Sequence, residues 1–219
     1  MPASAQISNG IAGIVEQRQN VNIEVGLSGG NSGDELLAQR NIWLKPFGSV
    51  GKQNDKEDIN GFDLKAYGFG IGVDGEYKPS QNFGLALFYT RANVDVNNVN
   101  QESNLDVVTA LTYGNVPIID DKTNLLYQVG YAWQMTDSTR NAFTGDVASS
   151  DYTSKTASLD LKLIRDYQVN NNLLLQPMIT TTYRHYTNSS YKETGAGALN
   201  LNVQEFTSSE LLLGLGTMI

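Results

Sequence analysis

The sequence predicts an all-β fold: a transmembrane, antiparallel, up-and-down β-barrel with a short N-terminal α-helix in its lumen. Three observations predict it. Eight segments alternate apolar and polar residues, the links between them alternate short and long, and the segment ahead of them has helical spacing. Short turns on one rim and long loops on the other are typical of bacterial outer-membrane barrels. The predicted strands lie near 42–50, 63–77, 83–96, 104–115, 123–136, 153–167, 173–186 and 199–218.

The helix is predicted over 4–20, ahead of the first strand. Its apolar residues recur at helical spacing on one narrow face, at Ile7, Ile11, Ile14 and Val15. Ser4 is a suitable N-cap. Gly10 and Gly13 each weaken an isolated helix by about 1 kcal/mol, so the helix is expected to need surrounding walls, which the same glycines would let approach closely. An unstructured leader ahead of the first strand is the alternative.

The links between the predicted strands differ in length. The links after the second, fourth and sixth strands are tight: 78–82 (KPSQN), 116–122 (VPIIDDK) and 168–172 (QVNNN). The links after the first, third, fifth and seventh strands are longer and polar, as in 51–62 and 137–152. We therefore expect the short turns in the periplasm and the long loops outside the cell.

One face of each predicted strand is apolar and is expected to contact lipid. In the second strand this face carries Tyr67, Phe69, Ile71, Val73 and Tyr77, and in the fourth it carries Leu105, Val107, Thr109, Leu111 and Tyr113. Leu87 and Leu161 have the same parity, whereas Thr112 is expected in the lumen. A soluble β-sandwich also alternates, but its outer face would be rich in Lys and Glu. Here the face opposite the apolar one is mostly Gly, Ala, Thr and Gln, which favours a crowded, hydrated barrel lumen over the surface of a sandwich.

Aromatic residues on the apolar parity gather at two levels. Those that flank the short turns are Tyr77, Phe83, Tyr113, Tyr127 and Tyr167. Those nearer the long loops are Tyr67, Tyr89, Trp133 and Tyr183. Two aromatic belts are expected where a barrel crosses the two lipid–water interfaces.

Composition narrows the possible functions of this 219-residue chain. The net charge of −8 argues against nucleic-acid binding, which needs clustered Lys and Arg. The sequence has no run of 18 apolar residues, so it predicts no membrane-spanning helix. Its low mean hydropathy is still compatible with a barrel, because only every second residue of a barrel strand contacts lipid. The chain has no cysteine and one histidine, so a Cys/His zinc site is impossible.

The lumen face of the second strand is the candidate site for holding the helix. Gly68, Gly70 and Gly72 would offer a smooth strip along that face. Arg18, toward the C-terminus of the helix, would lie at the level of Asp74 or Glu76 and pair with one of them. In a hydrated lumen such a pair is worth about 0–1 kcal/mol, so steric filling is expected to dominate.

The sequence offers little for catalysis or cofactor binding. A Ser–His–Asp triad would have to use His185, which Asp137, Asp146 or Asp151 could approach from a long loop, but a solvated loop is the simpler interpretation. The acidic run 54–58 lacks the spacing and glycine of an EF-hand. We therefore predict no enzyme activity, no catalytic or metal site and no cofactor.

Five motifs, in this order, resemble the translocator domain of classical (type V) autotransporters. They are 43–48 (WLKPFG), 67–74 (YGFGIGVD), 83–89 (FGLALFY), 111–114 (LTYG) and 191–199 (YKETGAGAL). The resemblance implies a barrel that anchors an N-terminal passenger domain in the outer membrane and helps to secrete it. It also implies about twelve strands, a monomeric barrel, outer-membrane lipid around it and assembly by the barrel-assembly machinery.

The resemblance leads to three expectations about the limits of the chain. Residues 1–22 would be the linker and pore helix, and residues 40–219 the barrel. The C-terminal part of the barrel would lie outside this sequence, because eight strands enclose too little space for a helix. The true N-terminus of an exported protein would lie outside it too, because no signal peptide follows Met1. Some family members cut their own linker at an Asn–Asn pair, but Asn20 and Asn22 are separated here, so that route is not supported.

Two other functions remain open from the residues alone. One is a structural or porin-like outer-membrane barrel without a passenger, which an open lumen would favour. The other is a barrel hydrolase with a His–Asp pair at its rim. A helix inside the lumen would favour the translocator.

Overall fold

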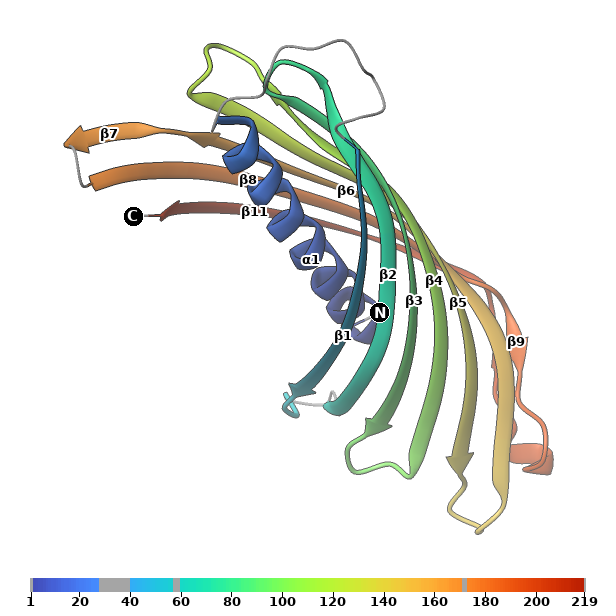
Figure 1. The fold of residues 1–219 in the computed structure, drawn as a ribbon. Coiled ribbons are helices and arrows are strands. Elements are labelled where there is room, and N and C mark those ends of the chain that lie inside the picture. The colour runs from blue at the N-terminus through green and yellow to red at the C-terminus, as the bar shows by residue number, and fades with distance from the viewer. Residues whose placement is uncertain (1, 28–39, 57–59, 171–172, 219) are drawn as a thin grey trace.

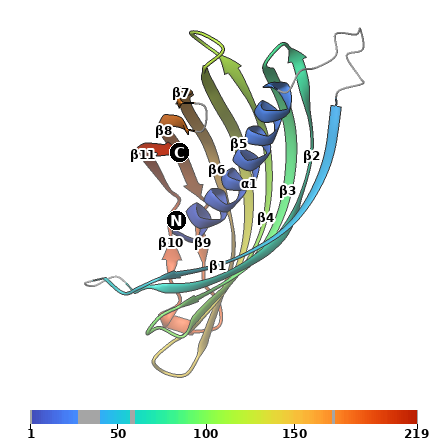
Figure 2. The same ribbon diagram turned by 60° about the vertical axis from the view of Figure 1, so that its left-hand side comes forward.

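One long helix lies in the concave face of a strongly curved sheet (Figures 1 and 2). The computed structural model describes residues 2–27, 40–56, 60–170 and 173–218. The helix is α1 (Pro2–Leu27). The long strands are β1 (Arg40–Gln53), β2 (Phe62–Lys78), β3 (Gln81–Val96), β4 (Gln101–Pro117), β5 (Thr123–Asn141), β6 (Val147–Arg165), β8 (Leu173–Asn188) and β11 (Phe206–Met218). Shorter elements are β7 (Tyr167–Asn170), β9 (Tyr191–Lys192), β10 (Asn202–Val203) and a 3₁₀ turn at Gly197–Leu199.

The long strands pair antiparallel in chain order, β1-β2-β3-β4-β5-β6-β8-β11. This confirms the predicted up-and-down topology, with the helix on the inner side of the sheet. Tight links explain the order, because a short turn can join only neighbouring antiparallel strands. Among the described residues, no helix is both long enough and apolar enough to span a bilayer.

The apolar parity faces outward, as predicted, in β2, β3, β5, β6, β8 and β11. On β3, for example, Leu87 is 55% exposed whereas the adjacent Phe88 is 1% exposed. The outward side chains form an apolar surface of the kind that lipid covers. Register carries this parity across the sheet, because Ile71 lies opposite Leu87, and Tyr127 lies opposite Leu161.

On β4 the prediction was wrong, because its apolar parity faces the lumen. Leu111 is 8% exposed and lies opposite Ala86 and Gly130, both on the inner face. Thr112 therefore points outward, with its hydroxyl donating to the Gly84 carbonyl. The physical reason is the helix, which covers this part of the inner wall and makes apolar residues favourable there. The inward set is Leu105, Val107, Thr109, Leu111 and Tyr113.

The loop lengths also differ from the prediction. The expected long loops 51–62 and 137–152 shrink to 54–61 and 142–146, because β1, β5 and β6 run further than the apolar pattern. Residues 57–59 of the first loop lie outside the described residues, as do 171–172 of the third short turn. Small inward residues permit the extension of the β5–β6 pair, since Ser138, Ala148 and Ser150 are buried on the inner face.

The last predicted strand, 199–218, is interrupted. Its first part is the 3₁₀ turn and β10, which pairs with β9, and β11 begins only at Phe206. Arg140 on β5 fixes this outer hairpin with two hydrogen bonds to the Glu193 carboxylate, of 3.1 and 2.6 Å. These bonds hold the pKa of Glu193 below its usual value. The backbone N–H of Leu201 donates to the same carboxylate.

The aromatic belts are present on the outer face, with one exception. Tyr77, Phe83 and Tyr167 are exposed near the short turns. Tyr67, Tyr89, Trp133 and Tyr183 lie outward nearer the opposite rim. Tyr113 was wrongly assigned to the first belt, because it shares the inward parity of β4 and is 1% exposed.

Candidate functional site

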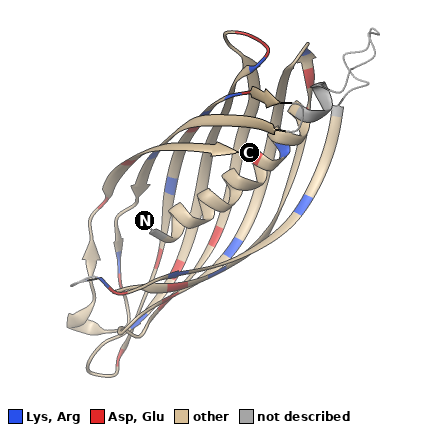
Figure 3. Cartoon of the chain, turned by 90° about the vertical axis from the view of Figure 1, so that its left-hand side faces the viewer, with Lys and Arg blue, Asp and Glu red and all other residues tan. Residues whose placement is uncertain are grey.

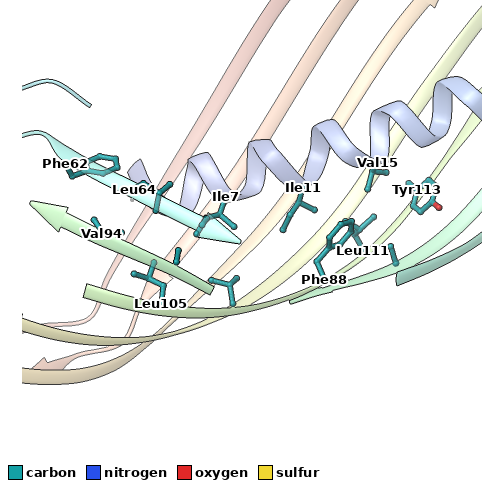
Figure 4. Packing of buried hydrophobic residues seen from close by; sticks show 14 residues of the cluster. Ile7, Ile11, Val15, Phe62, Leu64, Phe88, Val94, Leu105, Leu111 and Tyr113 are labelled. Atoms are coloured by element: carbon teal, nitrogen blue, oxygen red, sulfur yellow. The ribbon is translucent and has the colours of Figure 1, made fainter. Parts of the chain in front are cut away.

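The helix packs its apolar face on the wall formed by β2, β3 and β4. Figure 4 shows Ile7, Ile11 and Val15 directed toward the strands, where Phe88 and Leu111 lie beneath them. The three helix residues are 5%, 2% and 0% exposed. Burying three aliphatic side chains of this size contributes about 1.5–3 kcal/mol each. The predicted apolar stripe is therefore the docking face of the helix, which runs beyond 4–20 to Pro2–Leu27.

The glycine strip of β2 makes room for aromatic rings rather than for the helix itself. A Cβ at Gly70 would lie 2.3 Å from the Phe88 ring, and one at Gly72 would lie 2.4 Å from the Trp43 ring. At Gly68 a Cβ would meet the Tyr89 carbonyl oxygen at 2.1 Å. Trp43 and Phe88 lie with ring centroids 5.9 Å apart and join the cluster under the helix. The glycines thus act on the helix indirectly, through the rings they admit.

Two helix predictions are corrected. Gly10 and Gly13 were expected to allow close approach to a wall, but a Cβ at either position would meet no described atom within 4 Å. At 3.6 residues per turn they lie about 100° and 160° around the helix from Ile11, the centre of the docking face. Ser4 does not cap the helix, which begins at Pro2. Instead its hydroxyl donates to Gln134 on β5, at 2.8 Å.

Arg18 and Asp74 form the central polar contact between helix and barrel. Arg18 donates from Nε and from a terminal nitrogen to the two Asp74 carboxylate oxygens, at 2.7 and 2.8 Å. The Asp74 side chain is 0% exposed and that of Arg18 is 23% exposed. The Tyr113 hydroxyl also donates to Asp74, at 2.6 Å, and accepts from the Trp43 indole at 2.8 Å. Glu76 does not join this site, because it accepts from the Ser80 backbone N–H in the β2–β3 turn.

Because Asp74 is buried, loss of this ion pair should destabilise the domain more than loss of an exposed pair would. A value of about 0–1 kcal/mol applies to exposed pairs. A carboxylate without exposed surface depends on its partners, because loss of one partner leaves a buried charge uncompensated. The geometry is the bidentate arrangement that suits Arg and carboxylate best.

Further helix contacts were not predicted. Gln19 is 2% exposed, and its amide donates to the backbone carbonyls of Gly114 and Tyr127 at 2.7 and 3.0 Å. Gln128 on β5 donates to the Gln19 side chain at 3.0 Å. On β6, Lys162 forms an ion pair with Glu16 at 2.7 Å. Helical spacing gives a weak signal for Gln19, which continues the i, i+4 row of Ile11 and Val15.

The helix is also tied to the far wall. Arg184 on β8 donates to the Asn9 side chain at 2.6 Å and to Glu210 on β11 at 3.1 Å. Polar residues of α1 therefore reach β2, β5, β6 and β8, in addition to the apolar contacts. Together these contacts fix both the depth and the rotation of the helix in the lumen.

The rim offers no catalytic triad among the described residues. His185 Nδ1 lies 3.0 Å from Ser209 Oγ, on the outward parity between β8 and β11. Within the described part of the chain, His185 has no hydrogen bond to an Asp or Glu. Asp137 faces Asp151 across the β5–β6 pair instead. The same residues contain no group of three or more acidic or histidine side chains placed to hold a metal ion.

The curved sheet, its lipid-facing parity and the docked helix define an outer-membrane β-barrel domain with an N-terminal helix in its lumen. The sequence pattern of the Autotransporter beta-domain matches residues 42–219. The chain therefore belongs to the Autotransporter beta-domain family, which confirms the predicted family, fold class and outer-membrane location.

Relatives and solved structures agree with this family. Outer membrane protein B of Rickettsia prowazekii is 22% identical over 198 residues, which make up 86% of this chain and 12% of that protein. The translocator domain of autotransporter NalP from Neisseria meningitidis matches with a TM-score of 0.72 at 13% identity, covering 97% of this chain and 70% of that chain. The beta domain of the Bordetella autotransporter BrkA matches with a TM-score of 0.61 at 17% identity, covering 81% and 69%. The chain thus spans about an eighth of the length of the Rickettsia relative.

Proposed function

We propose that this domain anchors an N-terminal passenger in the outer membrane and helps to secrete it, with α1 as the linker that remains in the lumen. The observation that carries the proposal is the buried contact between Arg18 of the helix and Asp74 of the barrel wall. A helix that merely lay near the sheet would need no bidentate partner on a fully buried carboxylate.

The barrel and the helix have separate roles in this proposal. Paired strands satisfy their backbone hydrogen bonds inside the bilayer, which makes the barrel a stable anchor. The polar inner face gives a secreted chain a path that avoids lipid. After passage, the last segment folds as α1 on the β2–β4 wall. The resulting contacts hold the linker, and whatever precedes it, at the cell surface.

The same proposal covers the finer assignments. Residues 1–22 serve as the linker and pore segment, and residues 40–219 as the barrel domain. Arg18, Asp74 and the glycines Gly68, Gly70 and Gly72 position the helix, the glycines through the aromatic rings. The barrel acts as a monomer, is inserted by the barrel-assembly machinery and has no catalytic role of its own. A porin-like function is disfavoured because the helix occupies the inner side of the sheet.

Orientation gives the first test. We expect Phe143→Cys, in the β5–β6 link, to be labelled in intact cells by a membrane-impermeant thiol reagent, because Phe143 is 90% exposed and this rim would face outward. Asp121→Cys, in the β4–β5 turn, should be labelled only after the outer membrane is permeabilised. The native chain has no cysteine to interfere. Labelling of Asp121→Cys in intact cells would mean that the barrel has the opposite orientation, and it would contradict secretion through the rim that carries Phe143.

A further inference from the structure

The helix does not fill its surroundings evenly. Toward β2, β3 and β4 its side chains pack tightly. Toward β6 and β8 a cavity of about 90 Å³ remains, lined among others by Ala12, Glu16, Gln128, Asp160, Lys162 and Thr182. A second cavity, of about 20 Å³, follows along the helix against β4, β5 and β6, where Ser8, Leu111 and Ser158 are among its lining residues. A single water molecule needs about 10–15 Å³ of such space, so both cavities can hold water.

Polar side chains contribute to the lining of this gap on both sides. The strand residues that face it include Asp160, Lys162, Thr180 and Thr182, which share the inward parity of β6 and β8. Thr182 donates to Asp160 at 2.6 Å, and Lys162 pairs with Glu16 across the gap. Figure 3 shows charged residues on strands on both sides of the helix. A cavity of this size that offers two or more polar partners can hold ordered water.

Arg184 extends the polar lining toward the N-terminal half of the helix. The residue is 4% exposed, and its terminal nitrogens donate to Asn9 and Glu210. Its Nε has no partner among the described residues. Arg184 therefore adds a buried cation to the polar side chains on this side of the helix.

We propose that a hydrated path for small ions runs between α1 and the β6–β8 wall while the helix is docked. The proposal rests on the lumen position of the helix. In this arrangement the β2–β4 side provides the seal and the attachment. The β6–β8 side, with three acidic and two basic side chains (Glu16, Asp160, Glu210, Lys162 and Arg184), carries a small current.

The test uses two matched cysteine variants of the full domain in planar bilayers, with a small cationic methanethiosulfonate reagent. Thr182→Cys faces the proposed path, and Thr90→Cys lies on the inner face of β3 with 0% exposure. We expect the reagent to modify Thr182→Cys in the intact protein and to reduce its current. Thr90→Cys should react at least about tenfold more slowly, because a fully buried side chain reacts only through local opening. Deleting α1 should make Thr90→Cys react readily.

The outcomes separate the path from the proposed function. If Thr182→Cys is as protected as Thr90→Cys in the intact protein, no hydrated path lies on the β6–β8 side. If both react fast in the intact protein, and deleting α1 changes neither rate, the helix does not occupy the lumen and the proposed function fails as well. Heat-modifiable gel mobility would confirm that each variant is folded.

Discussion

Leu87→Arg is expected to destabilise the folded domain in lipid by about 2–4 kcal/mol, the cost of an outward-facing Arg near the bilayer midplane. Leu87 lies between the two aromatic belts and is 55% exposed on the outer face. Denaturant titrations of folding into lipid vesicles would measure the change. Because the destabilisation comes from contact between Arg and lipid, an Arg introduced on the outer face beyond the aromatic belts should destabilise the domain less.

Two adjacent threonines on β8 provide the matched control. Thr181 lies opposite Leu161 and Leu213 on the outward parity, and Thr182 lies opposite Asp160 on the inward parity. Thr181→Arg should therefore resemble Leu87→Arg. Thr182→Arg should cost much less, because the hydrated side of the lumen supplies a carboxylate for the new cation. Equal losses from the two threonine variants would mean that the faces are assigned wrongly.

Arg18→Met is expected to destabilise the domain by about 3 kcal/mol, the low end for removing one partner of a buried ion pair. The loss of stability is expected to be at this low end because the Arg18 side chain is 23% exposed and Tyr113 would still donate to Asp74. Methionine keeps much of the packing volume and removes the charge. The free energy of unfolding of the complete domain, measured by denaturant titration, gives the loss.

A double-mutant cycle assigns this loss to the charge. Adding Asp74→Asn to Arg18→Met should recover much of the stability, since no buried charge then remains unpaired. Lys45→Met removes a different helix–barrel hydrogen bond, the exposed 3.1 Å contact with Gln17, and should change stability by no more than about 0.5 kcal/mol. Additive effects of Arg18→Met and Asp74→Asn would contradict a coupled pair.

Strand parity was predictable where only one face was apolar. In β2, Gly68, Gly70, Gly72 and Asp74 alternate with the large apolar residues Phe69, Ile71 and Val73, so a period of two identifies the lipid face. In β4 both faces hold apolar residues, with Val108 and Ala110 on one and Leu105 and Leu111 on the other. Only the position of the helix decides which set is buried, and the strand sequence does not contain that information.

At the candidate site, too, some contacts were predictable from the sequence and others were not. A pair between Arg18 and either Asp74 or Glu76 followed from the direction of β2 and the polarity of the helix, but the sequence did not decide between the two carboxylates. The partners of Gln19 could not be predicted, because they are backbone carbonyls that every residue possesses. The role of Gly70 and Gly72 was missed because Phe88 and Trp43 lie far away in the sequence and reach these glycines only through strand register.

The central claim is that α1 occupies the lumen and restricts it, and single-channel conductance tests this most directly. The complete domain and a variant without residues 1–27 would be compared in the same planar bilayer, with Lys45→Met as a control that leaves the helix in place. We expect the deletion to raise the conductance several-fold, because it empties the space over the β2–β4 wall, and the control to match the unaltered domain. An unchanged conductance after the deletion would contradict the account, since a helix that occupies the lumen cannot be removed without widening the path for ions.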